Sequence, residues 1–90
     1  MLKVSVISPE AVLFEGDAES VVAPAFDGEV GILENHAPMM TLLGNGVLRL
    51  GGGSGEAGRG NARHFNIEGG FLQVVDNNVR IVTERAEVAY

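Results

Sequence analysis

Few side chains of this 90-residue chain have the type and spacing that chemistry at a site requires. The only histidines are His36 and His64, and two histidines without a suitably spaced third ligand make a weak metal site. No serine lies in a Gly-x-Ser-x-Gly motif, and the absence of cysteine excludes disulfides and thiol catalysis. Asp27 and Glu29 could pair as general acid and base, but their spacing also fits the outer face of a strand or turn. We therefore expect no catalytic residue, no metal and no cofactor.

Two classes of small β-domain and one ligand-binding loop motif also fit this sequence poorly. A lipoyl or biotinyl carrier presents a lysine at a hairpin tip, whereas the only lysine, Lys3, lies in the first predicted strand. Residues 51–60 hold six glycines, but a phosphate-binding loop would end in Gly-Lys-Ser/Thr before a helix. An oligonucleotide-binding barrel needs a basic groove with stacking aromatic residues, and the net charge of −6 opposes it. We expect neither nucleic acid nor a small-molecule substrate.

The negative charge is concentrated in one half of the chain. Residues 1–48 hold seven acids and one base, and residues 49–90 hold five of each. This sign disfavours nucleic acid and anionic lipid and favours a cationic protein surface, although such a charge is also ordinary for a solubilising surface. No apolar run approaches the about 18 to 20 residues that cross a bilayer, and the N-terminus does not resemble a signal peptide. We expect no membrane insertion and a cytosolic location.

Short apolar or alternating runs between glycines predict the elements that would position any site. They cover residues 2–7, 11–15, 19–24, 30–33, 39–43, 47–50, 64–68, 71–75 and 79–83. Gly16-Asp17 and residues 76–78 are predicted turns, Asn45-Gly46 is a hairpin signal, and Gly69-Gly70 breaks a strand. Residues 86–90 are too short to assign, and no segment is long enough to hold a helix alone.

Taken together, the runs predict an all-β fold. We expect residues 1–90 to form a single-domain, two-layer β-sandwich of about ten short strands. Residues 51–60 cannot pack a core, and we predict a flexible, glycine-rich loop there.

The most informative segment is residues 27–41, which have the character of a structured loop that feeds a strand. Gly28 and Gly31 permit backbone angles or close approaches that other residues resist. Ile32 and Leu33 are apolar within a polar stretch, and we expect them to anchor it. Residues 35–38 turn the chain into the next strand. Such a loop either braces a sheet or presents a surface to a partner, and the residues alone leave both open.

This segment resembles the signature of a known family. Residues 28–33 read Gly-Glu-Val-Gly-Ile-Leu and residues 35–38 read Asn-His-Ala-Pro. They resemble the Gly-Glu-x-Gly-Ile-Leu-Pro-Asn-His-Ala-Pro motif of the epsilon subunit of bacterial F-type ATP synthases. Residues 2–10, 14–22, 65–74 and 78–86 resemble that family's other strands, so the likeness covers nearly the whole chain.

Three features depart from the family pattern. Glu34 stands where the family usually has proline, which loosens the turn and adds a charge. The glycine-rich segment 51–60 is longer than the usual connection. The sequence stops at Tyr90, before the C-terminal helical hairpin that brakes ATP hydrolysis and binds ATP in some members. We expect this chain to lack that inhibition.

The resemblance implies a role without chemistry. In the family, this domain is a ten-stranded β-sandwich at the foot of the central stalk. It joins the gamma subunit to the membrane c-ring, so that ion-driven rotation reaches the catalytic head. The expected location is the cytoplasmic face of the bacterial plasma membrane, as a peripheral part of the complex.

The resemblance also assigns roles to individual residues. By position in the motif, the expected c-ring contacts are Glu29, Val30, Gly31 and Ile32. The expected gamma contacts are Ser8, His36 and Thr41. The residues expected to shape the loop are Gly28, Asn35, Ala37 and Pro38. The alternative function, from a different class, is a free-standing acidic β-sandwich that binds some other cationic protein.

Overall fold

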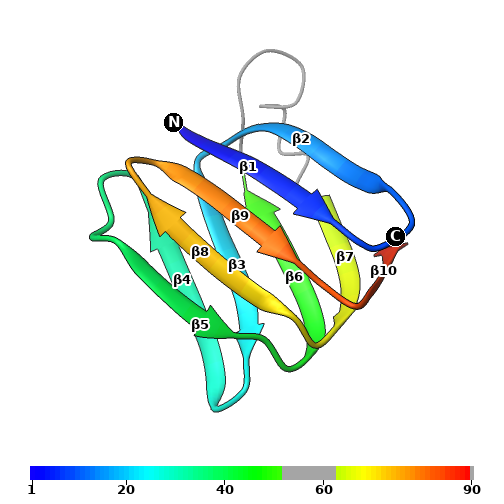
Figure 1. Cartoon of the computed structure of the whole chain (residues 1–90). Coiled ribbons are helices and arrows are strands. Elements are labelled where there is room, and N and C mark those ends of the chain that lie inside the picture. The colour runs from blue at the N-terminus through cyan, green and yellow to red at the C-terminus, as the bar shows by residue number, and fades with distance from the viewer. Residues whose placement is uncertain (52–62, 90) are drawn as a thin grey trace.

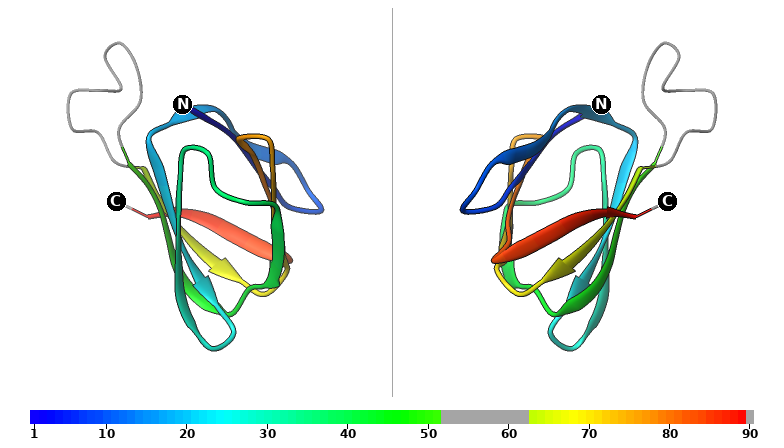
Figure 2. Two further views of the ribbon diagram at one scale, coloured as in Figure 1. Left: turned by 90° about the vertical axis from the view of Figure 1, so that its left-hand side faces the viewer. Right: turned by 90° about the vertical axis from the view of Figure 1, so that its right-hand side faces the viewer.

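The computed structural model describes residues 1–51 and 63–89, and every regular element within them is a β-strand. The ten strands are Leu2–Ile7 (β1), Val12–Ala18 (β2), Ser20–Ala25 (β3), Gly28–Leu33 (β4), Met39–Leu42 (β5), Asn45–Gly51 (β6), Arg63–Glu68 (β7), Phe71–Val75 (β8), Asn78–Val82 (β9) and Arg85–Ala89 (β10). They form two five-stranded sheets that lie face to face, as Figure 1 and the edge-on views of Figure 2 show. The predicted all-β, two-layer sandwich is confirmed.

The two sheets draw their strands from both halves of the chain. The first sheet has the order β2-β1-β9-β8-β5, and the second has the order β10-β7-β6-β3-β4. All neighbours are antiparallel except β1 and β9, which pair in parallel. The strands β4 and β5 are edges of different sheets and lie on the same side of the sandwich, joined by residues 34–38 (Figure 1).

The core lies between the sheets, and in β1 it is built by alternation. In β1, Leu2, Val4 and Val6 are buried while Lys3 is exposed, because successive side chains of a strand point to opposite faces. The second sheet supplies Leu48 and other side chains from the opposite layer. No buried side-chain nitrogen or oxygen among the described residues lacks a hydrogen-bond partner. The two buried polar side chains of the described residues, Ser8 and Thr83, use their hydroxyls on neighbouring backbone groups.

Two of the predicted turns lie where the sequence places them. Asp76 and Asn77 both have positive φ, 50° and 64°, and they close the two-residue β8–β9 hairpin. Gly69 and Gly70 carry the chain from β7 in the second sheet to β8 in the first. At Gly70, φ is 102° and an added Cβ would lie 1.9 Å from the carbonyl oxygen of Val82, so only glycine fits.

Two other turn predictions are wrong. Gly16-Asp17 lies inside β2 and pairs with β1, where the ring of Phe14 lies 3.2 Å from the place of a Gly16 Cβ. Asn45-Gly46 lies inside β6, since β5 and β6 belong to different sheets and no hairpin joins them. In both places, long-range strand pairing overrides the local turn preference. Residues 85–89, which the sequence leaves mostly unassigned, form β10 on β7.

The glycine-rich segment is described only at its start. Gly51 ends β6, where it pairs with Ser20 of β3. The rest of the predicted flexible loop, residues 52–60, lies outside the described residues.

Candidate functional site

The β3–β4 hairpin, residues 20–33, carries the first group of candidate residues. β4 is an edge strand that pairs only with β3, and Glu29 lies opposite Pro24 near the turn. Gly28 has φ 137° and follows the two-residue turn of Phe26 and Asp27. The hairpin projects from the sandwich, at the bottom of the view in Figure 1.

The turn end of this hairpin is tied to the end of β5 and to the residues that follow it. The backbone N–H of Phe26 donates to the carbonyl of Leu42 at 3.2 Å, and that of Gly44 donates to the carbonyl of Pro24 at 2.8 Å. An isolated bridge joins Ala25 to Leu43. These bonds link the second sheet to the segment leaving the first, so the hairpin is held at a fixed angle to the body.

Residues 29–33 alternate between solvent and core. Glu29 and Gly31 are exposed, Val30 is half-buried against the core, and Ile32 is fully buried. Ile32 therefore has no surface for a direct c-ring contact, and that expectation is corrected: its side chain anchors β4. Leu33 is 65% exposed, so the expectation that it anchors the segment is also wrong. The segment is a strand, so the neighbouring side chains of Ile32 and Leu33 point to opposite faces of the sheet.

Glu29 forms an ion pair with Arg49. The Nη2 of Arg49, on β6, lies 3.3 and 3.4 Å from the two carboxylate oxygens of Glu29. Both side chains stay open to solvent, with exposures of 44% for Arg49 and 57% for Glu29. Sequence reasoning missed Arg49, because 20 residues separate the two and only the sheet brings them together.

Residues 34–38 connect the two edge strands and are clamped to the β8–β9 turn. Asn35 has φ 67°, and its backbone N–H donates to Oδ1 of Asn77 at 2.6 Å. The Nδ2 of Asn77 donates back to Oδ1 of Asn35 at 3.4 Å. Ala37 and Pro38 are exposed, and with Asn35, Asn77 and their neighbours they line a surface hollow of about 350 Å³.

His36 is engaged by its own loop. Its backbone N–H donates to the carbonyl of Leu33 at 3.2 Å, and its Nδ1 lies 2.7 Å from the carbonyl oxygen of Ala37. A carbonyl only accepts, so Nδ1 carries a proton and Nε2 is left for a partner. The side chain is half-buried.

Ser8 and Thr41 lie near opposite margins of the first sheet. Ser8 follows β1 and is buried, with 9% exposure, and its Oγ accepts the N–H groups of Glu10 and Ala11 at 3.3 Å. Its hydroxyl is thus used within the β1–β2 turn. Thr41 lies on the edge strand β5 opposite Leu72 and is half-buried.

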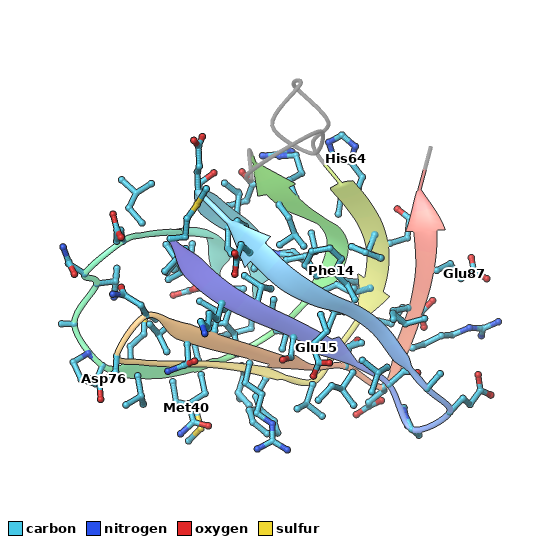
Figure 3. All side chains as sticks on the ribbon, turned by 90° about the horizontal axis from the view of Figure 1, so that it is seen from above. Phe14, Glu15, Met40, His64, Asp76 and Glu87 are labelled. Atoms are coloured by element: carbon cyan, nitrogen blue, oxygen red, sulfur yellow. The ribbon has the colours of Figure 1, made fainter. Side chains whose placement is uncertain are left out.

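Between them runs a row of apolar side chains on the outer face of the first sheet. We call it the apolar belt; its members, one from each strand, are Val12, Ile7, Val82, Phe71 and Leu42. Each is the cross-strand neighbour of the next, and cross-strand neighbours share a face. Val12 and Leu42 are 57% and 62% exposed. Met40, 67% exposed, lies two residues before Leu42 and points away from the core (Figure 3).

The belt was not predicted, yet the sequence carries a signal for it. Four of its members, Ile7, Val82, Phe71 and Leu42, adjoin a buried apolar residue in the chain. Since adjacent strand residues face opposite ways, one of each such pair must point to solvent. What the pattern cannot reveal is that the outward members line up, because alignment depends on strand register.

The described residues contain no group of three or more histidine, cysteine, aspartate or glutamate side chains that could hold a metal ion. His64 lies on β7 of the second sheet (Figure 3), whereas the sequence places His36 in the loop between the edge strands β4 and β5. An open surface hollow of about 450 Å³ lies over β1, β2 and β9. No helix in the part described is long and apolar enough to cross a membrane.

The comparison with known families decides the assignment. The sequence model of the ATP synthase delta/epsilon chain β-sandwich domain matches residues 1–89. The chain belongs to this ATP synthase family. It is 45% identical to the ATP synthase epsilon chain of Leptospira borgpetersenii over 83 residues, and 41% identical to that of Leptospira interrogans serovar copenhageni.

The delta/epsilon match concerns one part of longer relatives. The aligned region covers 92% of this chain and 61% of each Leptospira protein. Among solved structures, a chain of the Euglena gracilis mitochondrial ATP synthase F1/c-ring assembly superposes with a TM-score of 0.81 at 22% identity. That match covers 97% of this chain and 52% of the other, and it shows a shared fold.

Proposed function

We propose that this domain is a non-catalytic central-stalk subunit of an F-type ATP synthase, joining the gamma subunit to the c-ring so that rotation is coupled to ATP synthesis. The observation that carries the proposal is a delta/epsilon sandwich with two separate exposed surfaces of different chemistry. A torque-transmitting link needs two contacts on one stiff body, and a close-packed core supplies the stiffness.

The gamma subunit is proposed to dock on the outer face of the first sheet. The belt offers a continuous apolar row, and Thr41 and Ser8 adjoin its members Leu42 and Ile7. Apolar surface of this kind is the main source of affinity in stable interfaces. His36 would contribute through Nε2, for which the described residues supply no hydrogen-bond partner, at the loop that leads into β5.

The c-ring is proposed to meet the β3–β4 hairpin. Glu29 and Gly31 are exposed on the edge strand, and Val30 supports them. The excess of acid in residues 1–48 suits a cationic partner loop. Gly28, with positive φ, would fix the shape of this turn, whereas Asn35, also with positive φ, Ala37 and Pro38 would fix the loop at the other end of β4.

This role places the domain at the cytoplasmic face of the bacterial plasma membrane as a peripheral component. It needs no substrate, metal or cofactor and no membrane insertion. The runner-up is a free-standing acidic sandwich that binds another cationic protein.

Binding to the gamma subunit of the same organism tests the proposal first. Calorimetry with size-exclusion chromatography is expected to show a one-to-one complex. Adding the chain to epsilon-free enzyme is then expected to restore coupling of ATP hydrolysis to ion pumping. A folded chain that neither binds gamma nor restores coupling would favour the runner-up.

A further inference from the structure

Arg49 and Glu29 form the only ion pair between side chains in the part of the chain that the structure describes. Arg49 is one of the six basic residues of a chain that has twelve acidic residues. Its guanidinium lies against the carboxylate that is proposed to meet the c-ring. The pair therefore affects how readily the carboxylate of Glu29 can bind a cationic partner.

The register explains how the two side chains reach each other. Val22 of β3 lies opposite Arg49 on β6 and opposite Gly31 on β4, so all three share the outer face of the second sheet. Glu29 lies two residues from Gly31 on that face. The guanidinium thus crosses β3 on the diagonal. The space beside Gly31 is open, because a Cβ added there would meet nothing within 4 Å. No side chain of Gly31 therefore lies next to the Arg49 guanidinium.

The geometry of the pair is that of a weak, exchangeable contact. A single nitrogen, Nη2, reaches both oxygens, at 3.3 and 3.4 Å, whereas a strong arginine–carboxylate pair uses two nitrogens at about 2.7 to 2.9 Å. Both partners are largely exposed, and exposed pairs contribute little free energy. Breaking this contact costs little, and it does not immobilise Glu29.

We propose that Arg49 is an internal competitor for Glu29 that lowers the affinity of the hairpin for a cationic loop of the c-ring. The inference rests on the proposed c-ring contact. In the free subunit, Arg49 neutralises the carboxylate. On docking, the cation of the partner displaces the guanidinium, so the contact between Arg49 and Glu29 must be given up for the c-ring contact to form.

The test is a double-mutant cycle on docking. The chain, bound to gamma, is titrated onto the c-ring of the same organism in nanodiscs, at low and at high salt. Arg49→Gln is expected to tighten docking about two- to fivefold at low salt, the range of exposed ion pairs. Glu29→Gln is expected to weaken it. In the Glu29→Gln background, Arg49→Gln is expected to bring no gain.

A matched control separates competition from net charge. Arg85→Gln removes the same charge from β10, the opposite edge of the second sheet, where Arg85 has no ion pair within the described residues. It is expected to leave docking unchanged. Circular dichroism melts are expected to show each glutamine variant folded.

The outcomes are distinguishable. If Glu29→Gln weakens docking but Arg49→Gln weakens it too, or leaves it unchanged, the competitor role is overturned while the c-ring contact stands. An equal gain from Arg85→Gln, or a gain that persists without Glu29, would also overturn it. If Glu29→Gln has no effect, the proposed c-ring contact fails, and the competition fails with it.

Discussion

The β3–β4 hairpin and the outer face of the first sheet present opposite kinds of surface. The hairpin exposes two glycines and the carboxylate of Glu29 on the edge strand β4, and this carboxylate forms a weak ion pair with Arg49 of β6. The belt exposes five apolar side chains, one on each strand across the whole sheet. Buried apolar anchors provide most of the affinity of an interface, while charges at its rim tune rate and specificity. The comparison teaches that one small sandwich can present an apolar surface and a charged surface on different strands.

The largest effect is expected at the residue that anchors the hairpin to the body. Ile32→Ala empties a fully buried position and is expected to lower the free energy of unfolding by about 2–5 kcal/mol. Its neighbour Leu33 is 65% exposed, and Leu33→Ala is expected to stay within about 0.5 kcal/mol. Urea titrations of both variants measure the difference. Equal losses would mean that the two side chains share the core.

The belt is expected to show the next largest effect. Leu42→Asp puts a charge at the end of the row and is expected to weaken gamma binding about tenfold or more, with the fold intact. Val47→Asp is the control, since Val47 is an exposed apolar residue on β6 of the other sheet. Calorimetry with gamma compares them. If Val47→Asp weakens gamma binding as strongly as Leu42→Asp, the gamma surface is not confined to the belt.

The clamp between the loop and the β8–β9 turn comes third. Asn35→Ala forces alanine into φ 67° and is expected to cost about 1–2 kcal/mol of unfolding free energy. Asn35→Gly relieves that strain and loses only the side-chain bond from Asn77, at 3.4 Å, so it is expected to cost less. Thermal melts give the order. Equal costs for the two variants would mean that the amide pair, which both remove, and not the backbone angle, holds the loop.

The smallest effect is expected at the hairpin tip. Glu29→Gln removes an exposed charge, so the free energy of unfolding is expected to change by less than about 1 kcal/mol. Docking to the c-ring is expected to slow by about fivefold or less at low salt and to be nearly unaffected at high salt. Surface plasmon resonance at two salt concentrations measures the rates. A salt-independent loss would argue that Glu29 acts through shape.

Local pattern predicted much of this molecule. Alternation in residues 2–7, the Asp76-Asn77 turn and the Gly69-Gly70 break follow from φ, ψ and side-chain period, which are properties of neighbouring residues. The motif at residues 28–38 pointed to the family, and the family match over residues 1–89 agrees.

Local pattern also misled where pairing partners mattered. Gly16-Asp17 and Asn45-Gly46 have turn chemistry, yet both lie within strands. Ile32 and Leu33 look alike in sequence, and only the facing sheet distinguishes the buried one from the exposed one.

The sequence by itself therefore determined the fold class, the core period and the family. Only the tertiary structure decided which side chains meet: the belt, the Asn35–Asn77 clamp and the Arg49–Glu29 pair all join residues from different strands or turns. The physical reason is that strand register is set by contacts between distant segments. A shift of one residue would turn every outward side chain inward while leaving the local pattern unchanged.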